Sequence, residues 1–100
     1  MKIKRYMIMN IPVAQQIIGS LGKRFDSHAF IFKLKNEHRE EYDRYLENSD
    51  VNAAHGRISN ELGKNHLILN IARDGDIKSI NTEGNLSECA VWRKNQNNTR

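Results

Sequence analysis

Histidine and cysteine are the residue types here best suited to metal binding or nucleophilic catalysis. The four histidines are His28, His38, His55 and His66. None has a cysteine or a second histidine at the short spacing typical of zinc sites. The single cysteine, Cys89, follows Glu88, and a neighbouring carboxylate disfavours the nucleophilic thiolate. We therefore expect no metal site, no cofactor and no catalytic cysteine.

Carboxylates and glycines offer no better catalytic pattern. Glu40, Glu41 and Asp43 lie on what reads as the solvated face of a helix, whereas a general acid–base pair needs convergent, desolvated groups. Gly19 and Gly22 do not form a phosphate-binding loop. We expect a protein that is not an enzyme, has no small-molecule substrate, and acts by binding.

Basic and amide side chains are the better candidates for function. The candidate contact residues for nucleic acid or a protein partner are Lys23, Arg24, Asn52, Gly56, Arg57, Asn60, Lys64, Lys78, Arg93 and Lys94. Lysine and arginine contact phosphates, and arginine and asparagine also reach base edges. Arg57 is expected to be the strongest contact, because its guanidinium offers a planar set of donors. Gly56 beside it would let a partner approach closely.

Charge is unevenly distributed along the chain. The net charge is +4, and the first 24 residues carry basic side chains without acids, whereas 37–50 is acidic. This distribution favours a polyanion or an acidic protein surface at the basic ends. The acidic segment would repel a nucleic-acid duplex laid across it.

Composition also limits the environment of the protein. A single cysteine excludes an internal disulfide, and no apolar run approaches the ~20 residues of a membrane span. We expect a cytoplasmic protein without membrane contact.

Trp92 could stack on a base, but a lone tryptophan in a small domain more often packs in the core. Met1, Met7 and Met9 are all plausible starts.

Three helical segments are predicted, and they would position most of the candidate contacts. Asn10 caps a helix at 11–21, and Asp26 caps a helical stretch at 26–48, which is either one helix or two shorter ones. Asp50 caps a helix at 51–62, which Gly63 ends. The outward face of this last helix carries Asn52, Ala53, Gly56, Arg57 and Asn60.

The remaining third of the chain has the pattern of strands. "HLILNI" at 66–71, "DIKSIN" at 76–81 and "SECAVWRK" at 87–94 are rich in β-branched and aliphatic residues. Asp74-Gly75 and Gly84-Asn85 predict two hairpin turns.

One hundred residues fit one domain. We predict an α+β fold, winged-helix-like, with three or four helices followed by a small antiparallel β-hairpin or sheet. Residues 11–94 form this domain, 1–10 form an extension or an edge strand, and 95–100 form a frayed polar tail.

Three motifs carry a family resemblance. They are "FDSHAFI" at 25–31, "AHGRISNEL" at 54–62 and "EGNLSECAVW" at 83–92. In these motifs the chain resembles small uncharacterised proteins from phages and mobile elements of Bacteroides-like bacteria. Proteins in that setting commonly act by binding, and the resemblance transfers no site residue.

Two functions remain open at this stage. The first is a winged-helix-like regulator that binds nucleic acid through the 51–62 helix and the C-terminal hairpin. The second is an anti-defence inhibitor, similar to anti-CRISPR proteins, that docks on a host nuclease or another host protein or ribonucleoprotein.

Overall fold

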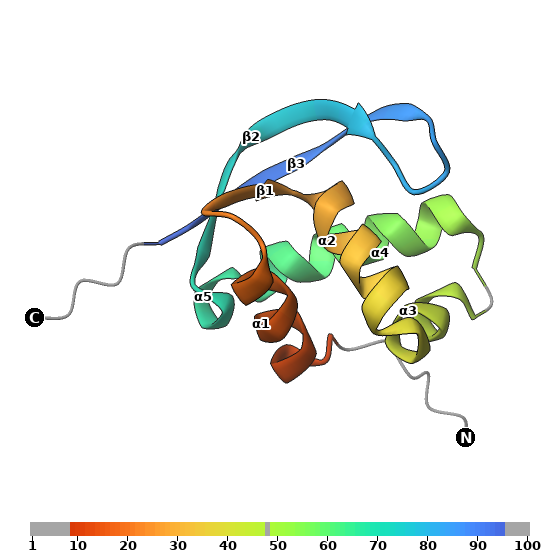
Figure 1. The fold of residues 1–100 in the computed structure, drawn as a ribbon, viewed down its shortest axis with the longest axis horizontal. Helices are drawn as coiled ribbons and strands as arrows, with labels where there is room; N and C mark the ends of the chain where they lie inside the picture. Colours follow the sequence, from red (N-terminus) through yellow and green to blue (C-terminus); the bar gives the residue numbers. More distant parts are fainter. Residues whose placement is uncertain (1–8, 48, 96–100) are drawn as a thin grey trace, which may run out of the picture.

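In the part of the chain that the structure describes, five helices combine with one antiparallel sheet. The computed structural model describes residues 9–47 and 49–95. Their elements are α1 (Ile11–Ser20), β1 (Arg24–Asp26), α2 (Ser27–Glu37), α3 (Arg39–Leu46), α4 (Val51–Lys64), α5 (His66–Leu69), β2 (Ile71–Ile80) and β3 (Leu86–Lys94). The strand order is β1-β3-β2, and the β2–β3 hairpin arches over α2 and α4 (Figure 1). The predicted α+β class is confirmed.

Side-chain caps start three of the helices where the sequence predicts. Asn10, Asp26 and Asp50 accept hydrogen bonds from the backbone N–H groups three residues further on, at 3.1, 2.8 and 2.8 Å. Each cap satisfies one of the donors that a helix leaves unpaired in its first turn.

The stretch predicted at 26–48 forms two helices. α2 and α3 meet at His38, whose backbone (φ −134°, ψ 58°) is not helical. Ile31 and Leu34 on α2, and Tyr42 and Tyr45 on α3, are all buried. One buried apolar stripe therefore continues on both sides of the break.

The end of the helical region differs from the prediction in two ways. α4 continues through Gly63 to Lys64, so Gly63 does not end it. Most of the stretch predicted as a strand at 66–71 is helix α5, because Leu69 turns into the core and Asn70 ends the helix in the left-handed conformation (φ 61°). Asparagine tolerates that conformation better than most residues.

Among the described residues the sheet contains one hairpin and not the two predicted. Asp74-Gly75 lies within β2, where the register against β3 shifts between Arg73 and Asp76. Gly75 has φ +99°, so this is a β-bulge, which inserts a residue and bends the strand. The turn predicted at Gly84-Asn85 is confirmed, with Gly84 at φ +83°.

Strand β1 was not predicted. It pairs antiparallel with β3, so that Phe25 lies opposite Trp92. Three residues are too few to show a strand periodicity.

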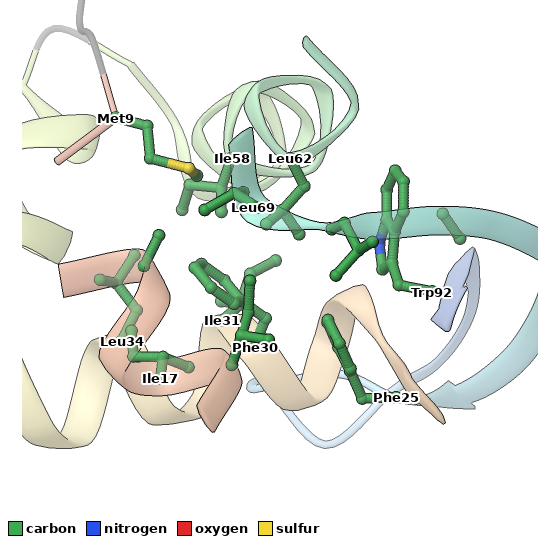
Figure 2. Close-up of a cluster of buried hydrophobic side chains, with 14 of the residues drawn as sticks. Met9, Ile17, Phe25, Phe30, Ile31, Leu34, Ile58, Leu62, Leu69 and Trp92 are labelled. Atoms are coloured by element: carbon green, nitrogen blue, oxygen red, sulfur yellow. The ribbon is translucent and has the colours of Figure 1, made fainter. Parts of the chain in front are cut away.

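The core lies mainly among the helices, with the strand residues Phe25 and Trp92 at one end of it (Figure 2). Six of the buried side chains are Ile31, Leu34, Ile58, Leu62, Val91 and Trp92. Ile58 and Leu62 on α4 have no exposed surface. Phe25 and Phe30, which flank the N-cap Asp26, are also buried. Trp92 is thus a core residue and does not offer a face for base stacking.

The ends of the domain extend slightly past the predicted limits. Met9, assigned to the N-terminal extension, is 5% exposed and packs in the core. Asn95, assigned to the polar tail, donates its backbone N–H to the Asn70 carbonyl at 3.0 Å. The rest of the predicted extension and tail, 1–8 and 96–100, lies outside the described residues. No helix among 9–47 and 49–95 is long and apolar enough to cross a membrane.

Candidate interaction surface along helix α4

A groove runs between α4 and the β2–β3 hairpin. One hollow, of about 350 Å³, is lined by Ser59, Asn60, Gly63, Arg73, Asp76, Glu88, Cys89, Ala90 and Trp92. A second, of about 240 Å³, is lined by Ser27, His28, Ile31, Asn52, His55, Gly56, Ser59, Asn81, Ser87, Glu88 and Cys89. The two adjoin because they share Ser59, Glu88 and Cys89. The small and amide side chains of α4 therefore form one wall of a polar groove.

A buried hydrogen-bond chain fixes the position of α4 beneath the sheet. The indole Nε1–H of Trp92 donates to the Ser27 hydroxyl at 3.0 Å, and that hydroxyl lies 2.8 Å from the Ser59 hydroxyl. Ser27 is 1% exposed, so it would be costly to leave it unpaired. The chain links β3, α2 and α4.

His28 ties the hairpin to α2. Its Nδ1 lies 2.7 Å from the Ser79 hydroxyl and its Nε2 lies 3.2 Å from the Ser87 hydroxyl. Ser79 lies in turn 3.8 Å from the Cys89 sulfur. Since both imidazole nitrogens are engaged by serines, His28 holds the arch of the hairpin in place.

His55 on α4 and Tyr42 on α3 form a second polar contact near the groove. The Tyr42 hydroxyl and His55 Nε2 are 2.8 Å apart. Burial lowers the pKa of His55 and raises that of Tyr42. Burial thus favours the neutral form of each group, and their contact links α3 to α4.

Arg57, expected to face a partner from the open side of α4, is half-buried and engaged within the fold. Its guanidinium donates to the Ser49 hydroxyl at 2.8 Å and to the Tyr45 carbonyl. Both acceptors lie at the α3–α4 connection, so Arg57 stabilises the turn between the two helices.

The other candidates on α4 are exposed. Asn52, Gly56, Asn60 and Lys64 recur every fourth residue and thus lie along one side of the helix. No side-chain hydrogen bond or ion pair engages Asn52, Asn60 or Lys64 within the part of the chain that the structure describes. This polar row is therefore accessible to a partner.

Gly56→Ala tests whether this row is used. A Cβ at Gly56 would meet no atom within 4 Å, and alanine favours a helix by about 1 kcal/mol over glycine. We expect a gain in the free energy of unfolding of about 0.5–1 kcal/mol in a urea titration, together with weaker partner binding, because the methyl group projects into the groove. Unchanged binding by the stabilised variant would show that nothing docks closely at this position.

Basic residues gather at the end of the sheet where Arg24 of β1 pairs with Arg93 of β3, which we call the base of the sheet. Arg24 on β1 lies directly opposite Arg93 on β3. Asp74 lies between their charges, 2.8 Å from Arg24 and 3.7 Å from Arg93. The hydrogen bond from Arg24 lowers the pKa of Asp74. Lys23, next to Arg24, is exposed, so this end of the sheet retains excess positive charge.

Lys78 and Lys94 were both predicted contacts. Lys94 adjoins this cluster, since its backbone N–H donates to the Lys23 carbonyl at 2.8 Å, but its side chain is engaged elsewhere. Lys94 Nζ donates to the Leu21 carbonyl at 2.7 Å and is partly buried, so it anchors β3 to the end of α1. Lys78 lies beyond the bulge, opposite Glu88 in the hairpin register. Glu88 and Asp76 make the groove itself less attractive to phosphate than the base of the sheet is.

Basic and acidic residues are equal in number across the described residues. The four basic residues in excess, Lys2, Lys4, Arg5 and Arg100, all lie outside them. Any attraction to a polyanion by the described fold therefore depends on where charges lie, not on their sum.

The sequence did not identify the hairpin wall of the groove. Arg73, Asp76, Glu88 and Cys89 line it. Because Asp74-Gly75 was assigned to a hairpin turn, the sequence did not predict the continuous strand β2, which carries Arg73 and Asp76.

Among 9–47 and 49–95, no three histidine, cysteine or acidic side chains are grouped to hold a metal ion.

Comparison with known proteins gives no match to a family model, to a curated protein or to a solved structure.

Proposed function

We propose that this chain is a non-enzymatic, winged-helix-like protein of the cytoplasm that binds nucleic acid through α4 and the base of the sheet. The observation that carries the proposal is the exposed row of Asn52, Gly56, Asn60 and Lys64, on a helix whose opposite face is buried in the core. Amides on such a helix can read base edges.

The connection between α3 and α4 supports the same proposal. The turn between them spans 47–50, a length typical of a helix-turn-helix unit, in which the second helix enters the major groove. The hydrogen bonds of Arg57 to Tyr45 and Ser49 brace this turn. The second helix is therefore presented at a defined angle.

The charge distribution indicates how a duplex would approach. Glu40, Asp43 and Glu47 on and after α3 are exposed and would repel phosphates. Lys64 at the end of α4, with Lys23 and Arg93 near the base of the sheet, would attract them. We expect a duplex to lie along the exposed row of α4, with its phosphates nearest Lys64 and the base of the sheet, and to avoid α3.

Titration of a fluorescently labelled random-sequence DNA duplex at several salt concentrations tests this proposal. Lys23→Ala and Lys64→Ala should each reduce the slope of log affinity against log salt by about 1, as expected for a lost phosphate contact. Arg39→Ala, on the acidic helix α3, is the matched control and should leave the slope unchanged. Failure of the parent protein to bind the duplex at low salt would refute the proposal.

A protein-docking inhibitor, of the anti-defence kind that the phage-like motifs suggest, is the second candidate. The exposed side chains of Leu67 (83%) and Ile68 (58%) on α5 favour it, since neighbouring apolar residues at a surface are common at protein interfaces. Such an inhibitor would bind its target with little salt dependence and would not bind naked nucleic acid.

A further inference from the structure

The outer edge of β2 is unpaired in the described fold. The sheet order is β1-β3-β2, so within 9–47 and 49–95 no strand lies on the far side of β2. An edge strand presents backbone N–H and C=O groups that can pair with another chain. This edge is ten residues long.

The bulge divides this edge into two parts. Beyond it, Asp76 to Ile80 pair regularly with Ala90 to Leu86 on β3. In this regular part Asp76 and Lys78 are exposed, and Ile77 between them is 42% exposed. An acid, which is paired with Arg73 across the bulge, an apolar residue and a base thus follow one another on an accessible strand.

We propose that β2 pairs antiparallel with β2 of a second copy, about a two-fold axis through Ile77. In this register Asp76 of each copy lies opposite Lys78 of the other, and the two Ile77 side chains meet. Directly opposed unlike charges stabilise an antiparallel pair, and like charges destabilise it. The arrangement is self-complementary, as a two-fold interface requires.

Neighbouring registers are less favourable. An axis through Asp76 would oppose two aspartates, and an axis through Lys78 would oppose two lysines. If the two-fold axis passed between two neighbouring residues instead of through one, the same residue of the two copies would lie on opposite faces of the joined sheet. The charge pattern therefore selects the register centred on Ile77.

The bulge sets the strength of this contact. Ser79 and Ile80 would face Gly75 and Asp74 of the second copy, where the backbone bends. Pairing is thus confined to a few residues, and an interface of that size is typical of a weak association. We infer a dimer that forms reversibly as protein concentration rises, and that salt weakens.

Sedimentation of the full chain without nucleic acid tests the pairing. The parent mass should rise from 11.6 kDa toward twice that value with concentration. Asp76→Lys and Lys78→Glu should each weaken dimerisation by about tenfold or more, because two attractive charge pairs become repulsive. Glu47→Lys, an exposed site on another surface, should dimerise like the parent. Melting temperatures check that all variants fold.

An equimolar mixture of the Asp76→Lys and Lys78→Glu chains is the decisive sample. In a mixed dimer the introduced lysine faces the introduced glutamate, and the remaining Lys78 faces the remaining Asp76. The mixture should dimerise as the parent does, which destabilised or misfolded chains would not do.

Three outcomes would overturn the pairing. They are a parent mass that stays at one chain at every concentration, a dimer that survives both charge reversals, or a mixture of folded variants that stays monomeric. If the parent stays monomeric while the amides of 76–80 are protected from hydrogen exchange at every concentration, β2 is covered by its own chain instead. The experiment uses no nucleic acid, so its failure leaves the proposed function untouched.

Discussion

Leu62→Ala is expected to lower the free energy of unfolding by about 2–5 kcal/mol, the range for deleting a buried leucine side chain. Leu62 has no exposed surface and lies in the core beside Ile58 (Figure 2). The substitution removes apolar burial and leaves a cavity, which the rigid helix α4 cannot fill. Urea unfolding monitored by circular dichroism measures the loss.

Leu67→Ala is the matched control for that substitution. Leu67 is 83% exposed, so its truncation should change the free energy of unfolding by less than about 0.5 kcal/mol. A loss below about 0.5 kcal/mol for Leu62→Ala would mean that α4 is rotated about its axis. The exposed row on its other side would then also be misassigned.

Arg57→Ala has the second largest expected effect. It should lower the free energy of unfolding by about 1–3 kcal/mol. The substitution removes the hydrogen bonds to the Ser49 hydroxyl and the Tyr45 carbonyl, and hydrogen bonds from a charged donor are among the stronger ones. It also leaves a partly buried carbonyl unpaired. The melting temperature should therefore fall, together with partner binding, because the α3–α4 turn loosens.

Arg44→Ala is the control for the loss of an arginine. Arg44 is 55% exposed and makes a surface pair with Glu41, an arrangement worth about 0–1 kcal/mol. If Arg57→Ala unfolds like the parent but loses binding, the Arg57 side chain leaves its intramolecular contacts and meets the partner directly.

The features predictable from sequence were those decided locally. The helix starts at Asn10, Asp26 and Asp50 follow from caps that need only the next three residues. The turn at Gly84 follows from a left-handed conformation that glycine adopts readily.

The features that could not be predicted depend on distant partners. Gly75 suits a hairpin turn or a bulge equally well, and pairing with β3 decides between them. The availability of Arg57 depends on the position of the Tyr45 carbonyl across the inter-helix turn. An arginine at this position indicates a strong hydrogen-bond donor. The sequence does not show that the guanidinium already donates to Ser49 and Tyr45.

The candidate site was predictable only in part. The regular spacing of Asn52, Gly56 and Asn60 correctly indicated an exposed row. The opposite wall of the groove is formed by a hairpin some 20 to 30 residues further along the chain, and no local pattern shows that it folds back over α4.

Amide chemical-shift mapping with a random-sequence DNA duplex tests the proposed function most directly. The account predicts shifts along the exposed side of α4, at Asn52, Gly56, Asn60 and Lys64, and at Lys23 and Arg93 near the base of the sheet, with none on α3. An unchanged spectrum at low salt, or shifts confined to α3, would contradict it.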